Sequence, residues 1–121
     1  MTEPRLDDYL DHIRQAAKDA CVFIERLDHD AFMADKRTQQ AVVMSLLIIG
    51  EAATKIMDLH KSFAEAHPNI SWQAMRGMRN RIAHGYFDIN LETVWSTVTT
   101  ALPELLASLK RKNSIDGGLD T

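Results

Sequence analysis

The chain has 121 residues, of which 45% are hydrophobic and 26% are charged, which is the composition of one ordinary globular domain. Its net charge at neutral pH is −3, so a broadly basic nucleic-acid-binding surface is excluded and any RNA contact must be local. The single cysteine, Cys21, excludes an intrachain disulfide and is expected to be a buried structural thiol. The chain shows no apolar leader, and the apolar run at residues 42–50 is too short to span a bilayer, so we expect a cytoplasmic protein without a membrane role.

Two long amphipathic helices are predicted in the first half of the chain. Apolar residues recur at alternating four- and three-residue spacing from Leu6 to Leu27, which places them on one stripe of a helix. The same pattern returns from Val42 to Ile56 and indicates a second helix of about twenty residues. In the connection, Asp30 and Asp35 are expected to cap helix N-termini, because their carboxylates can accept hydrogen bonds from free backbone N–H groups.

The second helix is apolar over more than one side, because Leu47, Ile48 and Ile49 are consecutive. Such a helix must be covered on more than one side, either at the centre of its own bundle or by a partner chain. We expect this face to take part in a homodimer, since it exceeds what one small bundle readily covers. Gly50, in the middle of the helix, would let another helix approach closely.

A third main helix is predicted from Trp72 to about Ala83. It follows a short helical turn at residues 61–67, and Ser71 is placed to cap it. Gly85 is placed to stop it, since glycine just beyond a helix commonly adopts the left-handed conformation that ends the backbone ladder.

The last helix is predicted from Leu91 to Leu109, with Asp88 or Asn90 as its cap. Pro103 lies within it and lacks the backbone N–H that a helix requires. We therefore expect a kink or a break near Pro103.

The elements together predict an all-α fold, an antiparallel bundle of four to five helices, because no strand signal or repeat interrupts them. Residues 1–112 are expected to form a single domain. Residues 113–121, which are poor in apolar side chains, are expected to form a flexible C-terminal tail.

Residues 79–86 place a permanent cation, an amide, a titratable imidazole and a phenol close together in the chain. Arginine offers a planar fork of donors for phosphate oxygens, and the unperturbed pKa of histidine, about 6.5, lets it give and take protons near neutrality. No acidic residue occurs within residues 69–86, so three arginines form a basic island there: Arg76, Arg79 and Arg81. The segment suits phosphodiester chemistry.

Arg79 and His84 do not point the same way on a regular helix, because five residues correspond to roughly 140° around the axis. Either a break at Gly85, which would free His84 to swing, or a second copy of the motif across a dimer interface would bring them together. Asn80 and His84, four residues apart, are neighbours on one face.

The segment Arg79-Asn80-x-x-x-His84 followed by Gly85-Tyr86 resembles the signature of the HEPN superfamily. Within that superfamily it resembles the HepT-like ribonuclease toxins, whose motif is Arg, four residues, His, any residue, Tyr. Three further features of this sequence match the same family: Ile49-Gly50-Glu51-Ala52, Trp72 and Leu102-Pro103. The resemblance spans roughly residues 6–109 and implies a HEPN-like fold.

The resemblance implies a metal-independent endoribonuclease without a cofactor, in which the 2′-hydroxyl of RNA attacks its own phosphodiester. Its catalytic residues would be His84, which moves protons, and Arg79, which stabilises charge in the transition state. It also implies a homodimeric toxin of a type VII-like toxin–antitoxin pair, acting on RNA, expected to be tRNA, and not on DNA. The plainer interpretation is a histidine at a helix end beside an ordinary exposed arginine.

Four other residues of the candidate site are expected to support it. Asn80 is interpreted as a group that orients the histidine or donates to a phosphate, or as a surface amide. The resemblance places Glu51 beside Arg79, and a structural ion pair is the alternative. Arg76 and Arg81 are interpreted as RNA phosphate contacts or as solvated charges.

Tyr86 has three interpretations. It is a packing residue after the turn, a group that stacks on a nucleobase or contacts a phosphate, or an AMPylation site. The last follows from the resemblance, in which a cognate nucleotidyltransferase antitoxin attaches AMP to a tyrosine hydroxyl. A bulky anion two residues from His84 would repel RNA phosphate and so inhibit the enzyme.

A competing interpretation belongs to a different class of protein. Related helical bundles serve as non-catalytic, substrate-binding or scaffold partners of minimal nucleotidyltransferases, and the acidic pI of about 5.9 suits such a role. A plain helical adaptor is a third possibility, but it leaves the basic island unexplained.

The remaining histidines and the tryptophans point to structure rather than chemistry. His12, His29, His60 and His67 lack metal-ligand spacing and are expected at the surface, so no metal site is predicted. Trp72 and Trp95 sit at helical core spacing and are expected to pack in the core rather than to stack on bases.

Overall fold

The computed structural model describes residues 5–109, and every regular element in this part of the chain is helical, so the predicted all-α class is confirmed. The predicted tail, residues 113–121, lies outside the described residues. In chain order the elements are α1 (Leu6–Ile24), α2 (His29–Met33), α3 (Lys36–Leu59), α4 (Lys61–Ala66), α5 (Trp72–His84), the 3-10 turn η1 (Tyr86–Asp88), α6 (Leu91–Ser96) and the π-helical turn η2 (Thr97–Ala101), after which residues 102–109 are again α-helical.

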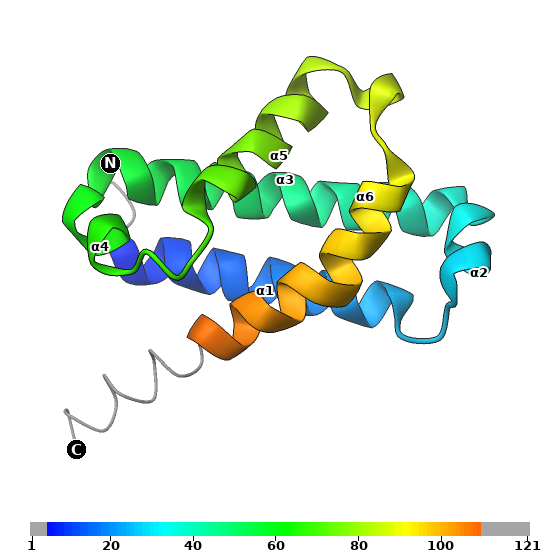
Figure 1. The fold of residues 1–121 in the computed structure, drawn as a ribbon, viewed down its shortest axis with the longest axis horizontal. Coiled ribbons are helices and arrows are strands. Elements are labelled where there is room, and N and C mark those ends of the chain that lie inside the picture. The colour runs from blue at the N-terminus through cyan, green and yellow to red at the C-terminus, as the bar shows by residue number, and fades with distance from the viewer. Residues whose placement is uncertain (1–4, 110–121) are drawn as a thin grey trace.

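Helix α3 is the centre of the bundle. It lies antiparallel beside α1, and α5 crosses it, while the helical stretch from α6 to residue 109 runs across α1 (Figure 1). Because α3 also contacts α2, α4 and α6, most of its apolar residues are covered from several directions within its own bundle, which is one of the two alternatives that its sequence left open. The largest fully buried side chains come from α1, α2, α3 and the last helical stretch: Ile13, Phe32, Val42, Ile49, Ile56, Val94, Val98 and Leu109. No helix within residues 5–109 is long and apolar enough to cross a membrane.

Aspartate caps begin both α2 and α3. Asp35 caps α3, as predicted: its carboxylate accepts hydrogen bonds from the backbone N–H of Thr38 at 3.1 Å and from the Thr38 hydroxyl at 2.7 Å. These bonds, first that from the hydroxyl, lower the pKa of Asp35. The prediction for Asp30 was wrong, because a short helix not foreseen from the sequence forms there. Asp28 caps this helix, and Asp30 lies inside its first turn.

The last helix is irregular just before Pro103, although it stays helical through this residue. Asn90 is its cap and accepts from the N–H of Thr93, so Asn90 rather than the other predicted candidate holds this position. Just before Pro103 the helix widens into η2, where the N–H of Leu102 donates to the carbonyl oxygen of Thr97, five residues back. Pro103 has no N–H to donate, so an irregularity was predicted at its position. The irregularity takes the form of this wider turn rather than an end of the helix.

The tryptophans pack in the protein, as expected. Trp72 is buried and its Nε1 donates to the carbonyl oxygen of His67 at 3.1 Å. Trp95 lies against Phe32, with ring centroids 5.3 Å apart. Cys21 is half-buried rather than fully buried, and this burial raises the pKa of its thiol.

Candidate active site

Arg79 lies where α5 crosses α3, directly over Gly50. A Cβ atom added at Gly50 would overlap the Cβ of Arg79 and would lie 2.8 Å from the carbonyl oxygen of Met75. Only glycine therefore lets the two helix backbones come this close. The prediction that Gly50 allows a close helix approach is confirmed, and the approaching helix carries the arginine of the motif.

The guanidinium of Arg79 is held by its two neighbours. Its Nε lies 2.9 Å from Oε1 of Glu51, and its Nη1 donates to Oδ1 of Asn80 at 2.9 Å. Nε is buried and has no hydrogen-bond partner of good geometry among the described residues, so the contact with Glu51 is an ion pair rather than a hydrogen bond. The proximity of Glu51 to Arg79 is thus confirmed, although Glu51 is exposed rather than enclosed by the apolar residues around it in the sequence.

Asn80 contacts the arginine of the motif rather than its histidine. With its oxygen accepting from Arg79, the part of its side chain that remains is an exposed amide nitrogen with two N–H donors. The structure records no hydrogen bond between Asn80 and His84 within residues 5–109, although the two are four residues apart on one helix. A donated bond from Asn80 to a phosphate stays a prediction.

His84 is exposed and is the last residue of α5. Because the helix is regular through this position, His84 and Arg79 leave it in directions roughly 140° apart. Arg79 reaches toward α3, and the helix does not bring His84 to it. Of the two predicted ways of joining them, the one within a single chain, a histidine freed from the helix by a break at Gly85, is therefore not what the structure shows.

Gly85 ends the helix but not in the predicted conformation. Its φ of −160° is extended backbone rather than left-handed, and its N–H still donates to the carbonyl oxygen of Arg81 at 3.1 Å. The left-handed prediction was wrong because the chain passes directly into η1, where the N–H of Asp88 donates to the carbonyl oxygen of Gly85 at 3.0 Å. The break comes after His84 and leaves it in the helix.

Tyr86 begins η1 and is 41% exposed. It does not belong to the buried core, so its interpretation as a packing residue loses support. Its ring is nearly perpendicular to that of Phe87, with centroids 6.0 Å apart, and Phe87 is 99% exposed. Phe87 was not predicted as a site residue, although an aromatic residue in so short a connection, away from any helical stripe, was a signal.

Arg76 faces α3, as Arg79 does. Its Nη2 donates to Oδ1 of Asp58 at 2.7 Å, so both arginines pair with carboxylates from α3. The basic island is therefore partly neutralised by acidic residues far away in the sequence. The role of Arg76 as an RNA phosphate contact stays a prediction, and any such contact must compete with Asp58.

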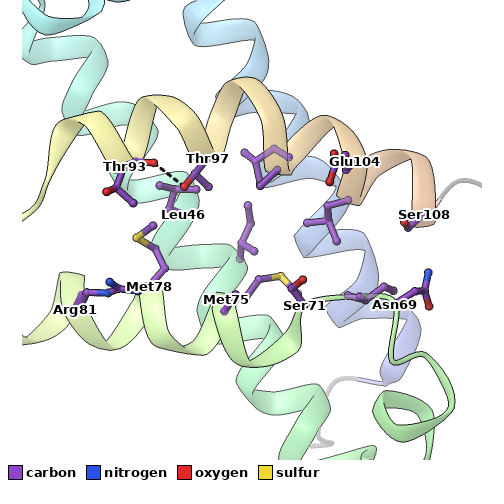
Figure 2. A pocket seen from close by; sticks show the side chains of 16 residues that line it. Leu46, Asn69, Ser71, Met75, Met78, Arg81, Thr93, Thr97, Glu104 and Ser108 are labelled. Carbon is purple, nitrogen blue, oxygen red and sulfur yellow. Dashed lines mark hydrogen bonds between the residues drawn. The ribbon is translucent and has the colours of Figure 1, made fainter.

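Arg81 lies on the other side of α5. It lines a cleft of about 340 Å³ between α5 and the helical stretch that runs from Thr93 to Ser108 (Figure 2). Met75 and Met78 point into the same cleft. Two residues correspond to roughly 200° around a helix, so Arg81 is not brought together with Arg79. Its contact with RNA phosphate also stays a prediction.

The exposed apolar face of α3 is narrower than its sequence suggested. Ile49 is only 2% exposed and belongs to the core, whereas Ile48 is 41% and Met44 is 56% exposed. Met44 and Ile48 are one helical turn apart, and Glu51, which pairs with Arg79, is one turn further along the same face of α3. The homodimer stays a prediction, with Met44 and Ile48 rather than Ile49 available for it.

The other histidines do not form a metal site within residues 5–109, where no group of three or more His, Cys, Asp or Glu side chains is placed to hold an ion. His12 is exposed, while His29, His60 and His67 are half-buried. His67 Nδ1 lies 2.7 Å from the carbonyl oxygen of Phe63. None of the four lies in the motif.

Comparison with known proteins identifies the family. Residues 8–111 match the family described as ribonuclease HepT-like. The chain is 35% identical over 104 residues to a protein of Thermococcus cleftensis named as a probable ribonuclease HepT, and the match covers 86% of this chain and 92% of that protein. It is 34% identical over 102 residues to a protein of Caldanaerobacter subterraneus named as a candidate RNase, covering 84% of this chain and 88% of that protein. No solved structure gives a significant match. The chain belongs to the HepT-like ribonuclease family.

Proposed function

We propose that this chain is the endoribonuclease toxin of a type VII-like toxin–antitoxin pair, cleaving RNA, with tRNA as the expected substrate, without a metal ion. Membership of a ribonuclease family supports a nuclease activity in general. The observation that carries the finer proposal is the fixed guanidinium of Arg79, which the close approach at Gly50 and the pair with Glu51 hold at the surface of the motif helix. A pre-oriented cation is what a phosphorane-like transition state requires.

The reaction we propose needs a proton acceptor and a proton donor. The 2′-hydroxyl oxygen forms a bond to the adjacent phosphorus while its proton passes to a base, and the bond to the 5′-oxygen breaks as that oxygen takes up a proton. A 2′,3′-cyclic phosphate and a 5′-hydroxyl result. His84 is the residue proposed for proton transfer, and Arg79 for stabilising charge on the phosphate oxygens.

A homodimer would bring together Arg79 and His84, which lie apart within one protomer. In one chain Arg79 is turned toward α3 while His84 ends the helix on another side. We therefore propose a homodimer in which the motifs face each other, so that Arg79 of one protomer works with the histidine of its partner. The exposed Met44 and Ile48, on the helix that holds Arg79, offer apolar surface for that contact.

Mixing two inactive variants tests this arrangement. Arg79→Ala and His84→Ala homodimers should each be inactive, whereas their heterodimer keeps one intact pairing of arginine and histidine. After unfolding and refolding an equal mixture, we expect about a quarter of the wild-type RNA cleavage, since half of the dimers are mixed and each has one intact site. No recovery despite heterodimer formation, shown by mass spectrometry, would contradict a shared site. Cleavage by wild type in EDTA tests the metal-free reaction, and a strict requirement for added Mg²⁺ would contradict it.

Tyr86 is the proposed point of control by a cognate nucleotidyltransferase antitoxin. Its exposed position in η1 leaves the hydroxyl accessible, and AMP there would place a phosphate charge two residues from His84. Co-expression with the nucleotidyltransferase should add the mass of one AMP group to the wild type but not to Tyr86→Phe. Modification of another residue, or none with an active partner enzyme, would contradict this proposal.

The scaffold alternative has one observation in its favour. Two arginines of the basic island, Arg76 and Arg79, already pair with carboxylates, and the chain is acidic as a whole. A non-catalytic partner of a minimal nucleotidyltransferase would bind that enzyme but would not cleave RNA. A purified wild-type dimer that leaves total tRNA and other cellular RNA intact while binding the nucleotidyltransferase would favour the scaffold over the enzyme.

A further inference from the structure

Phe87 is the most exposed large apolar side chain in the described part of the molecule. It is 99% exposed, whereas the other exposed apolar residues lie between 41% and 59%. Those others include Val22 and Phe23 on α1 and Met44 and Ile48 on α3, where each flanks buried neighbours on a long helix. Phe87 instead lies in η1, outside the core, so folding of this protomer gains almost nothing from it.

Phe87 lies beside the motif. It follows His84 by three residues, so their Cα atoms are within about 11 Å of each other. Its ring stands at 86° to the ring of Tyr86, with centroids 6.0 Å apart, and the residue as a whole is 99% exposed, so a base can reach the ring from solvent. An exposed aromatic face next to a proton-transfer histidine, with Arg79 and Arg81 on the same helix, is the combination that single-stranded RNA binding uses.

We infer that Phe87 is a stacking platform for a nucleobase next to the scissile phosphate, and so a binding and specificity residue for RNA. The inference rests on the proposed ribonuclease function. The ring takes the π-face of the base, which every base possesses, while arginines contact the phosphates. Stacking would hold the strand with the adjacent 2′-hydroxyl next to His84. In this role Phe87 binds the base and does not itself act on His84.

Three substitutions separate stacking from simple apolar contact. Phe87→Trp keeps a stacking ring, Phe87→Leu keeps apolar volume without a ring, and Phe87→Ala removes both. Phe23→Leu on α1, an exposed phenylalanine away from the motif, is the matched control. The probe is single-stranded 2′-O-methyl RNA, which lacks the attacking hydroxyl and therefore reports binding without cleavage.

We expect the Leu and Ala variants to bind the probe about tenfold more weakly and to cleave RNA with a raised KM and little change in kcat. Phe87→Trp should bind at least as tightly as wild type, and its added indole fluorescence should be quenched by the probe. Phe23→Leu should behave as wild type. Wild-type affinity in Phe87→Leu, or an indole that does not respond to bound RNA, would overturn the inference.

Three further outcomes are distinct. If Phe87→Leu turns the dimer into a monomer in sedimentation, the ring belongs to an interface between copies of this chain and the nucleobase platform is wrong. If wild type cleaves RNA and all Phe87 variants match it, only the platform fails. If wild type neither binds nor cleaves any RNA, the proposed function itself fails, and the platform with it.

Discussion

Two parts of α5, the stretch up to Arg79 and the end of the helix at His84, differ in how firmly the rest of the molecule holds them. In the first part, Arg76 and Arg79 pair with carboxylates of α3, and the backbone rests on Gly50. The second part ends at the exposed His84 and leads to an exposed turn. A packed and paired group keeps the orientation that the fold gives it, whereas an exposed one takes its orientation from whatever binds it.

The contrast divides the candidate site into a part that the fold of one protomer orients and a part that we propose a second protomer completes. Arg79 is pre-oriented within one protomer, which favours charge stabilisation, because a fixed cation needs no reorganisation during the reaction. His84 has no such support in the described residues, and Figure 1 shows the end of α5 projecting from the bundle. Changes in the first part should disturb both fold and activity. Changes in the second part should affect activity alone.

The largest expected effect is on RNA cleavage. Arg79→Ala and His84→Ala should each lower the rate at least about a hundredfold, as loss of a transition-state charge contact or a proton-transfer group commonly does. The two should differ in stability. His84→Ala should keep the wild-type melting temperature because the side chain is exposed, while Arg79→Ala should lower it slightly, because the pair with Glu51 is partly exposed and contributes less than about 1 kcal/mol. His84→Ala cutting RNA at the wild-type rate would refute its catalytic role.

Gly50→Ala should disturb the packing between α3 and the first part of α5. The added methyl would overlap the Cβ of Arg79, and overpacking of this kind costs about 1–3 kcal/mol, more than alanine gains as a helix former. Separation of the helices should also displace Arg79, so both the melting temperature and the cleavage rate should fall.

Gly77→Ala is the matched control for Gly50→Ala, since both glycines are inside helices. The nearest atom to an added Cβ there is Nη2 of Arg81 at 3.9 Å, an ordinary contact. Gly77→Ala should therefore stabilise the protein by about 0.5–1 kcal/mol and leave cleavage unchanged. If Gly50→Ala were as stable as Gly77→Ala, the close crossing would not be what positions Arg79.

Local features of the fold could be predicted from the sequence, and the partners in long-range contacts could not. The helical stripes, the cap at Asp35 and the irregular turn before Pro103 depend on residues near one another in the chain. That Gly50 would allow a close approach could be predicted from the glycine itself, but not that the approaching residue is Arg79. The partner of Arg76 is 18 residues away, and it depends on the angle at which two helices cross. Periodicity does not specify that angle.

The errors at the site have the same origin. The basic island looked unpaired because its segment holds no acid, and although Glu51 was expected beside Arg79, the pairing of Arg76 with Asp58 of α3 was not predicted. Ile48 and Ile49 are adjacent in the sequence, but one is exposed and the other buried, since successive helical residues point about 100° apart. The conformation of Gly85 depended on the turn that follows it, which residue preferences alone did not predict.

Glu51→Gln should leave the helices in place but hold the side chain of Arg79 less firmly. Glutamine keeps the size and an acceptor oxygen but removes the charge that pairs with Nε of Arg79. We expect a kcat lowered about tenfold with a KM no higher than wild type, because the guanidinium is less well oriented but carries less competing negative charge. An unchanged kcat would make Glu51 a structural partner only. A raised KM with a normal kcat would mean that it serves binding instead.

The smallest expected effect concerns His29, a histidine that titrates outside the motif and links α2 to α6. Its ring nitrogens lie 3.1 Å from Oδ1 of Asp30 and 2.8 Å from Oε1 of Glu92. These contacts, that with Asp30 first, raise the pKa of His29. A raised folded-state pKa means that protonated His29 stabilises the protein in full below its unfolded pKa of about 6.5, and that this contribution is lost as the pH rises through the folded pKa.

Thermal melting of wild type and His29→Gln near pH 6 and near pH 8 measures this contribution. Wild type should exceed the variant by more at about pH 6 than at about pH 8, by a small margin because the pair is solvent-exposed. Cleavage by His29→Gln should match wild type at both pH values, since His29 contacts α6 rather than the motif. A melting difference that grows with pH would contradict the assigned direction of the pKa shift. A cleavage defect would mean that the contact between His29 and α6 also affects, through η1, the position of the exposed end of α5.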